Sequence, residues 1–242
     1  QSEMWLKQNN IYFDKLIVNA RDKKKVCLEE NIDLLIDDSI SNCKNVITSG
    51  IPAIMIRNKF NIDNDIKCFQ NWKQIYDYIN ESKIIKIIKY NDNYKKDVCS
   101  FVNESMHKFI GRDYKERPDV SNINDYYIKN NGNFWLAIDV KTKNVIGTIA
   151  LENRENKYGI LKRFYVDEEY QNNGVGSKLY DMFYNYTKNM TKINKIYLAC
   201  GHVLDKAHQF YKRKGFIQKD NIDIDMHFAE DDDFFVKNLD RK

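Results

Sequence analysis

The sequence is poor in residues that interrupt regular structure, and it lacks apolar runs long enough for a membrane. Its 242 residues include only nine glycines and two prolines, Pro52 and Pro118, which excludes a proline-rich linker and a collagen-like repeat. A membrane helix needs roughly 20 apolar residues. The most apolar stretch, residues 84–90, is interrupted by Lys86 and Lys89. We therefore expect a soluble chain that does not associate with a membrane.

Cysteine pairs and strong net charge are also missing. Five cysteines occur without a C-x-x-C pair, so the sequence indicates neither a disulfide framework nor a zinc site and favours the reducing cytoplasm. The formal net charge of +4 is too small to predict nucleic-acid binding, although the basic excess lies after residue 82 and favours an anionic ligand there. The chain starts at Gln1 without the basic and apolar segments of a signal peptide, which suggests a shortened or processed product.

The sequence does contain a globular balance of 43% hydrophobic and 31% charged residues, and its length favours two compact units. In the first unit, short apolar runs alternate with helical patterns, which is typical of buried parallel strands in β-α-β units. The expected strands are 16–18, 34–38 and 53–56, and the expected helices are 23–30, 40–48 and 71–81, the last with Trp72, Ile75, Tyr76 and Ile79 on one face.

A second pattern begins near residue 82, so we predict two domains, residues 1–82 and 83–242. The strands expected in the second are 84–90, 134–140, 145–151, 159–166, 195–199, 223–228 and 234–239. Its expected helices are 94–109, 120–130, a segment that starts after Gly174, and 205–214. The sequence therefore predicts an α/β (α+β) chain.

The most specific motif is a glycine turn at residues 171–177, which follows an expected strand and precedes an expected helix. Glycine permits positive φ and a close backbone approach, and a helix N-terminus adds a positive dipole, so such a turn suits an anion. The segment has neither the G-K-[ST] of a P-loop nor the third glycine of a Rossmann fingerprint. The alternative is a solvated loop without a ligand.

Two motifs in this part carry a family resemblance. Residues 171–176 match Q/R-x-x-G-x-G/A, and residues 207–216 match A-x-x-F-Y-x-x-x-G-F. With the preceding strand at 161–166, they make residues 84–239 resemble the GNAT (Gcn5-related) N-acetyltransferases. The resemblance implies a mixed, mostly antiparallel sheet that is splayed between its fourth and fifth strands. It also implies direct acetyl transfer from acetyl-CoA to a primary amine of a small molecule or peptide, without a metal or a covalent acyl-enzyme.

The resemblance implies where acetyl-CoA binds. The backbone of Phe164, Tyr165 and Val166 would pair with the pantetheine arm. The pyrophosphate would be held at Gln171, Asn172, Asn173, Gly174, Val175, Gly176 and Ser177. Tyr211 falls where the family commonly places the general acid that protonates the leaving thiolate, and an O–H donor eases that departure. The alternative role of Tyr211 is packing of its helix beside Phe210 and Phe216.

Two positions depart from the family's pattern. Ile160 stands where many relatives have a glutamate, and Leu204 stands where an asparagine is frequent, so no general base can be carried over. The candidate bases by strand position are Asp139, Glu152, Cys200 and His202, and a structural role is the favoured alternative for each. His202 and His208 lack carboxylate or cysteine partners at ligand spacing, so we expect no metal site.

The acceptor pocket is expected within residues 106–131, where this family usually builds it. The segment carries polar side chains that suit a polar acceptor, namely Arg112, Tyr114, Arg117, Tyr126 and Tyr127. The alternative is a solvated pair of helices.

Residues 3–80 resemble the C-terminal half of a HAD-superfamily phosphatase of the 5'-nucleotidase-like branch. The matching segments are 5–7, 14–17, 22–27, 32–39 and 71–72. The resemblance implies that Lys23 or Lys24 neutralises a phospho-intermediate and that Asp37 and Asp38 hold Mg²⁺, which suits carboxylates at a strand's end. The alternative is a helix N-cap at Asp38 or Ser39.

The D-x-D strand and the Ser/Thr strand of that family do not occur here, and the family's sheet order would place both between strands 16–18 and 34–38. We therefore expect an incomplete HAD-like unit without phosphatase activity. Such a unit has three possible arrangements. The strands 16–18 and 34–38 pair directly, or another chain fills the gap between them, or the exposed apolar edge makes a homodimer. Two alternatives stay open for the whole chain. One is a bifunctional phosphatase and acetyltransferase whose N-terminus is missing, and the other is a non-catalytic CoA-binding interaction module.

Overall fold

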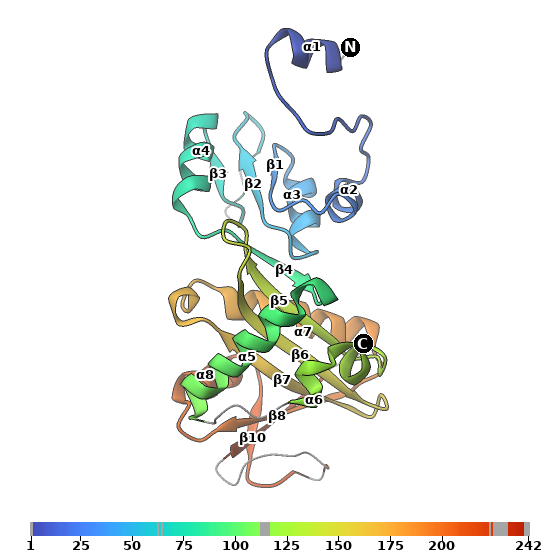
Figure 1. Cartoon of the computed structure of the whole chain (residues 1–242), viewed down its shortest axis with the longest axis vertical. Helices are drawn as coiled ribbons and strands as arrows, with labels where there is room; N and C mark the ends of the chain where they lie inside the picture. Colours follow the sequence, from blue (N-terminus) through green and yellow to red (C-terminus); the bar gives the residue numbers. More distant parts are fainter. Residues whose placement is uncertain are drawn as a thin grey trace.

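The strands of the chain form two separate sheets. The computed structural model describes residues 2–61, 63, 65–111, 117–222, 224 and 232–239 (Figure 1). Within these residues, the first sheet consists of parallel strands in the order β1 (Leu35–Asp37), β2 (Ala53–Ile56) and β3 (Cys68–Phe69). The helices of this part are α1 (Ser2–Gln8), α2 (Lys23–Glu29), α3 (Ile40–Ile47) and α4 (Trp72–Glu81).

Side-chain caps explain where the helices around the small sheet begin. The carboxylate of Asp22 accepts a hydrogen bond from the N–H of Lys25 at 3.1 Å, and the side-chain oxygen of Asn71 accepts one from Gln74 at 3.0 Å. Each cap supplies a partner for a backbone N–H that the helix itself leaves unpaired. The structure confirms the helices α2, α3 and α4 and the strands β1 and β2 that the sequence predicts.

The strand predicted at residues 16–18 is wrong. These residues adopt no regular structure, and Leu16, Ile17 and Val18 are exposed. A strand becomes stable when neighbouring strands supply hydrogen bonds and an apolar cover. The small sheet instead runs β1-β2-β3, and β3 is a strand that the sequence pattern missed.

The predicted face of α4 is also wrong. Ile75 is buried, but Trp72 and Tyr76 are exposed. Tyr78 packs instead on Phe69 of β3, with 5.0 Å between the ring centroids. Because the unforeseen strand β3 lies against this helix, it selects a side of α4 that the apolar spacing alone could not indicate.

The second sheet is larger and mostly antiparallel. Its order is β4-β5-β6-β7-β8-β10-β9, and among the described strands only the β7–β8 pair is parallel. The strands are β4 (Ile85–Lys89), β5 (Asn133–Asp139), β6 (Val145–Arg154), β7 (Tyr158–Val166), β8 (Lys195–Gly201), β9 (Ile217–Lys219) and β10 (Asp232–Asn238). The expected mixed, mostly antiparallel α/β sheet is thereby confirmed.

Helices cover both faces of the large sheet (Figure 1). On one face, α7 (Val175–Met190) and α8 (Asp205–Arg213) pack onto a core that contains Trp135, Phe183 and Phe235. On the other face lie α5 (Lys95–Ile110), α6 (Pro118–Ser121) and the π-helix η2 (Asn124–Ile128), around a core with Phe134 and Tyr127. Short 3₁₀ turns, η1 (Asp92–Tyr94) and η3 (Glu168–Tyr170), complete this part.

One prediction for this part needs correction, and another lies almost wholly outside the described residues. The single helix expected at 120–130 is divided into α6 and η2, with Asn122 in a non-helical conformation between them. The strand expected at 223–228 falls almost wholly outside the described residues. One side of β10 pairs with β8, and the other side pairs with β9 at Ile217–Lys219, which the sequence did not predict.

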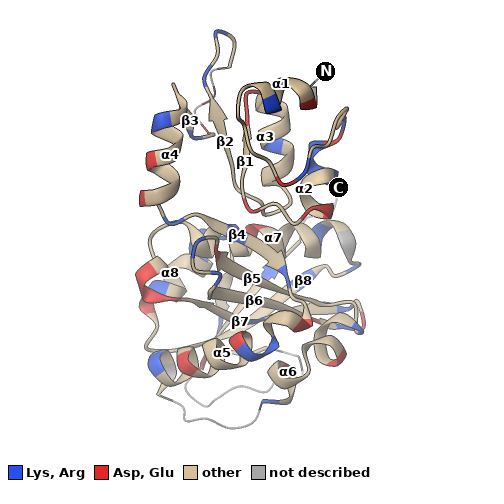
Figure 2. Cartoon of the chain, turned by 45° about the horizontal axis from the view of Figure 1, so that its top comes forward, with Lys and Arg blue, Asp and Glu red and all other residues tan. Residues whose placement is uncertain are grey.

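Charged contacts join the two parts of the chain. The carboxylate of Asp33, in the first part, accepts a hydrogen bond from the ammonium of Lys143 in the second part at 2.6 Å. It also lies 3.5 Å from the ammonium of Lys86 on β4. Figure 2 shows charged residues of both signs on both parts.

Among the residues placed by the structure, none of the helices combines the length and apolarity needed to cross a bilayer.

Candidate active site

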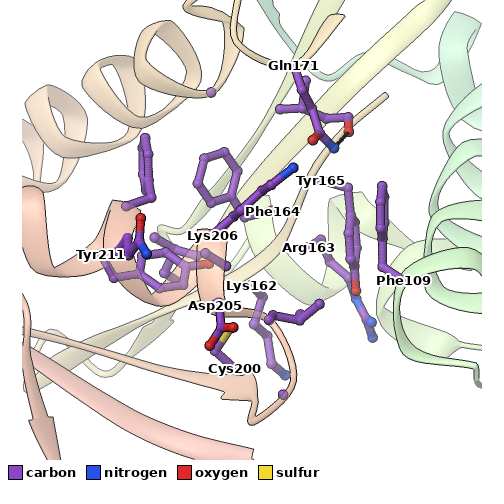
Figure 3. A pocket seen from close by; sticks show the side chains of 18 of the residues that line it. Phe109, Lys162, Arg163, Phe164, Tyr165, Gln171, Cys200, Asp205, Lys206 and Tyr211 are labelled. Atoms are coloured by element: carbon purple, nitrogen blue, oxygen red, sulfur yellow. Dashed lines mark hydrogen bonds between the residues drawn. The ribbon is translucent and has the colours of Figure 1, made fainter. Parts of the chain in front are cut away.

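A cavity opens where strands β7 and β8 separate. Within the described residues the two strands pair only at Gly159–Ile196 and Ile160–Tyr197, and beyond these positions they diverge. The cavity has a volume of about 1290 Å³ and is lined by β7, the glycine turn, β8 and α8 (Figure 3). A concave site of this size with a few polar groups is the usual form of a ligand-binding site.

A β-bulge shapes the wall that β7 contributes. Thr148 of β6 lies opposite Tyr165, whereas Ala150 lies opposite Lys162, so β7 holds one extra residue in between. Arg163 takes the left-handed conformation there, with φ of +51°, and its carbonyl accepts from the hydroxyl of Thr148 at 2.7 Å. A bulge re-aims side chains near an active site. Lys162, Arg163 and Phe164 all line the cavity.

The glycine turn forms one end of the cavity. Asn172 has φ of +61° and Gly174 has φ of +76°, and Gly174 is the N-cap of α7. The side-chain amide of Gln171 donates to the carbonyl of Val166 at 3.1 Å, which ties the turn to the end of β7. Because the first N–H groups of a helix have no carbonyl partner within it, this turn presents donors to an anion.

The structure brings most of the predicted binding residues to the cavity. Those that line it are Phe164, Tyr165, Val166, Gln171, Asn172, Gly174, Gly176 and Ser177. Asn173 and Val175 do not line it; Asn173 is exposed, and Val175 is buried in the core against the sheet. Only their backbone groups are therefore suited to a ligand.

Tyr211 lies deep in the wall of the cavity. It is 6% exposed, and its ring centroid lies 6.2 Å from that of Phe164 and 5.8 Å from those of Phe216 and Phe235. Burial raises the pKa of its hydroxyl well above the ordinary value, so the group stays protonated at neutral pH. Its ring packs the helix, and the side chain also faces the cavity (Figure 3).

The four candidate bases are placed differently. Asp139 accepts from Lys141 N–H at 2.8 Å and from Tyr170 O–H at 2.7 Å, and so closes a hairpin. Among the described residues that line the cavity, Cys200 is the one candidate present. Burial raises the pKa of its thiol to about 12, so it is not a thiolate at neutral pH.

The other two candidates have charged side-chain partners. Glu152 lies 2.7 Å from Lys162, and His202 lies 2.9 Å from Asp233. The carboxylate near His202 was not apparent from spacing, because β10 brings it from 31 residues away. Within the part of the chain that the structure describes, no group of three His, Cys, Asp or Glu side chains is placed to hold a metal.

A buried network beside the cavity was missed by the sequence. Arg163 makes two hydrogen bonds to Asp119, both at 2.7 Å, and the hydroxyl of Tyr127 donates to the same carboxylate at 2.6 Å. Burial opposes ionisation of Asp119, but Arg163 outweighs it and holds the pKa of the carboxyl below its ordinary value. The partners are 44 residues apart, so no local pattern could have revealed them.

The residues of the predicted acceptor region have different places in the structure. Arg112 and Tyr114 lie outside the described residues, and Arg117 lines the cavity. Tyr127 is fully buried in the core, so its expected place in the pocket wall is wrong. Its ring fills the space under η2, where an apolar body with a bonded hydroxyl is favourable.

Comparisons with known proteins agree with this geometry. A model of the "Acetyltransferase (GNAT) family" matches residues 98–216. A GNAT-family acetyltransferase structure from Staphylococcus aureus Mu50 is 33% identical, with a TM-score of 0.58, and the match covers 64% of this chain and 99% of that one. An acetyltransferase structure from Streptococcus agalactiae 2603 is 30% identical, with a TM-score of 0.58, over 64% of this chain and 98% of that one.

The match to another relative covers a smaller share of both chains. N-acetylaspartate synthetase of Xenopus tropicalis is 31% identical over 102 residues, which are 41% of this chain and 36% of that protein. The match therefore spans about a third of the relative's length. None of these findings shows the resemblance of residues 3–80 to HAD phosphatases, which stays a prediction.

Proposed function

The chain belongs to the GNAT family of acetyltransferases, whose acetyl donor is acetyl-CoA, and we propose that it transfers the acetyl group by direct attack of a primary amine. The observation that carries the proposal is the cavity between β7 and β8, with the glycine turn at one end and Tyr211 in its wall. The acceptor class is a small-molecule or peptide amine.

Acetyl-CoA binds, in this proposal, along β7 and at the start of α7. Beyond Ile160 the edge of β7 that faces β8 has no strand partner in the described residues, so the backbone of residues 164–166 can pair with the pantetheine arm. The N–H groups of residues 172–177 hold the pyrophosphate, because they converge at a helix N-terminus. The left-handed Gly174 makes that convergence possible without a steric penalty.

Tyr211 acts, in this proposal, as the general acid. The amine nitrogen attacks the thioester carbonyl carbon, an N–C bond forms, and the C–S bond breaks. The hydroxyl of Tyr211 gives its proton to the departing thiolate and recovers one from solvent, while the nitrogen releases one proton. The hydroxyl is protonated at neutral pH, as a general acid must be, and the side chain lines the cavity. No base is assigned, because Cys200 is protonated and Asp139, Glu152 and His202 lie in other bonds.

The test combines donor binding with turnover. Acetyl-CoA should raise the melting temperature in a concentration-dependent way, because a ligand that binds only the folded state stabilises it. A panel of amines should then include acceptors that release free CoA thiol. The proposal fails if millimolar acetyl-CoA does not raise the melting temperature.

The first part of the chain has no assigned activity. We place the domain boundary near residue 82, between the end of α4 at Glu81 and the start of β4 at Ile85, because the two sheets lie on either side of it. The ammonium of Lys23 binds the carboxylate of Asp37, which also accepts from the N–H of Ser39 at 2.9 Å. Release of phosphate from p-nitrophenyl phosphate would contradict the expected lack of phosphatase activity. The cytoplasmic location and the homodimer stay predictions.

A further inference from the structure

Two consecutive cations of β7 face the same side of the sheet. In a regular strand neighbouring side chains point to opposite faces. Here the ammonium of Lys162 donates to the hydroxyl of Tyr126 on η2 at 3.2 Å, and the guanidinium of Arg163 reaches Asp119 on α6. The bulge at Arg163 allows this, and both residues line the cavity.

The two cations differ in how their charge is balanced. Arg163 has a carboxylate partner of its own, because its guanidinium donates two hydrogen bonds to Asp119, and the two side chains are 14% and 8% exposed. Lys162 shares a carboxylate. Glu152 lies 2.7 Å from Lys162 and 2.5 Å from Arg154, so one buried negative charge faces two positive ones. This group of three carries a net charge of +1.

Lys162 is the member of that group that can meet a ligand. It lines the cavity and its side chain is 24% exposed, whereas Glu152 is 6% exposed and lies behind it. An ammonium has three N–H donors. Glu152 and the hydroxyl of Tyr126 account for two of these donors, so a third can serve a ligand in the cavity that Lys162 lines.

The position of Lys162 along β7 relates it to the acceptor. The glycine turn follows Val166, and Tyr211 packs beside Phe164. Lys162 precedes Val166 by four residues, which is roughly 13 Å at the usual rise of a strand. A donor molecule held at the turn with its thioester near Tyr211 therefore leaves Lys162 on the far side of the reacting atoms. The acceptor's non-reacting part must occupy that side.

We propose that the acceptor is a small amine that carries a carboxylate, and that Lys162 binds this carboxylate. The inference rests on the proposed acetyltransferase function and adds the class of substrate. A carboxylate matches the single positive charge of the Lys162–Glu152–Arg154 group, whereas a phosphate monoester carries about −1.5 to −2 at neutral pH. An amine without an anionic group leaves the cation unneutralised, and sites built for a polar group discriminate strongly against ligands that lack it.

The test compares each amino acid with its amide at saturating acetyl-CoA, using the full chain. The pair has nearly the same size and differs in charge. We expect kcat/KM to be at least about tenfold higher for the best amino acid than for its amide, and phosphoethanolamine to be a poorer acceptor. Equal or better use of the amides, or of phosphoethanolamine, overturns the proposal.

Variants of Lys162 make the test specific. Lys162→Met should raise KM for the amino acid at least about tenfold and bring the ratio of acid to amide close to one. Lys157→Met, at an exposed lysine paired with Glu155 in the β6–β7 turn, should keep the wild-type ratio. An unchanged ratio in Lys162→Met overturns the proposal. The wild-type comparison stands by itself if that variant does not fold. Loss of donor binding in the wild type would instead refute the acetyltransferase function, and this inference with it.

Discussion

The N–H of Ile87 donates a hydrogen bond to the carbonyl of Gly50 at 2.8 Å and thereby joins the two parts of the chain. Ile87 lies on β4, the first strand of the large sheet, whose other edge pairs with β5. Gly50 has φ of +87°, and a Cβ atom there would lie 2.2 Å from the carbonyl oxygen of Ile87. The first part of the chain thus covers an edge that would otherwise present unpaired backbone groups.

Gly50→Ala should destabilise the protein by at least about 2 kcal/mol, because it adds a backbone clash to left-handed strain. Gly111→Ala is the matched control, since Gly111 has φ of +64° but, apart from its chain neighbours, no atom of the described residues within 4 Å of its Cβ position. Urea unfolding of both variants measures the difference. Equal losses of stability in the two variants would show that the backbone at Ile87 can move away from the added methyl group without further cost.

Tyr211→Phe should lower kcat by about 10²- to 10⁴-fold, which is the usual contribution of a positioned acid or base. The ring and its contacts with Phe164 and Phe235 remain, so acetyl-CoA should still raise the melting temperature as in the wild type. Single-turnover release of CoA thiol measures the chemical step. Normal turnover in this variant would show that Tyr211 packs its helix and does not act as the general acid.

Gly174→Asp should weaken acetyl-CoA binding at least about tenfold relative to Gly174→Asn, a difference of about 1.4 kcal/mol. Asn and Asp both tolerate the left-handed conformation that Gly174 adopts, and they differ in charge. The comparison therefore isolates repulsion between the new carboxylate and the pyrophosphate. Calorimetric titration of acetyl-CoA gives both affinities, and equal values would place the pyrophosphate elsewhere.

Asp119 should make stability depend on acid pH. Its pKa is below the ordinary value in the folded state, although burial opposes this, because Arg163 binds the carboxylate. The unfolded chain then takes up the proton first, so this stabilisation is complete above the unfolded pKa of about 3.9 and is lost as pH falls through the lower folded value. Urea unfolding between about pH 2 and 7 measures the loss.

Asp119→Asn should lack that acid-dependent component and should be less stable by about 3–5 kcal/mol at neutral pH, because it leaves the buried Arg163 unpaired. Asp181→Asn is the control. Asp181 is an exposed carboxylate that lies 2.9 Å from Lys214, and its loss should leave the acid dependence in place. A wild-type acid profile in Asp119→Asn would contradict this role of the Arg163 pair.

The glycine turn and the helix that bears Tyr211 could be predicted from the sequence because their signals are local. A strand end, a left-handed Gly174 and a helix start lie within a few residues of one another, and spacing alone relates them. Most strands of the large sheet were predictable for the same reason, since each carries its own apolar pattern, but the exposed strand β9 has no such pattern and was missed. The strand expected at 16–18 failed because strand formation depends on neighbours, which a local pattern does not contain.

The sequence by itself determined most elements of the large sheet, the glycine turn at residues 171–177 and the helix that bears Tyr211. Tertiary structure alone decided the rest of the site. The separation of β7 from β8, the bulge at Arg163 and the pairing of Lys162 with Glu152 join residues that are distant in the chain or depend on register. Register and burial arise from the packing of whole faces, so a local sequence pattern does not contain them.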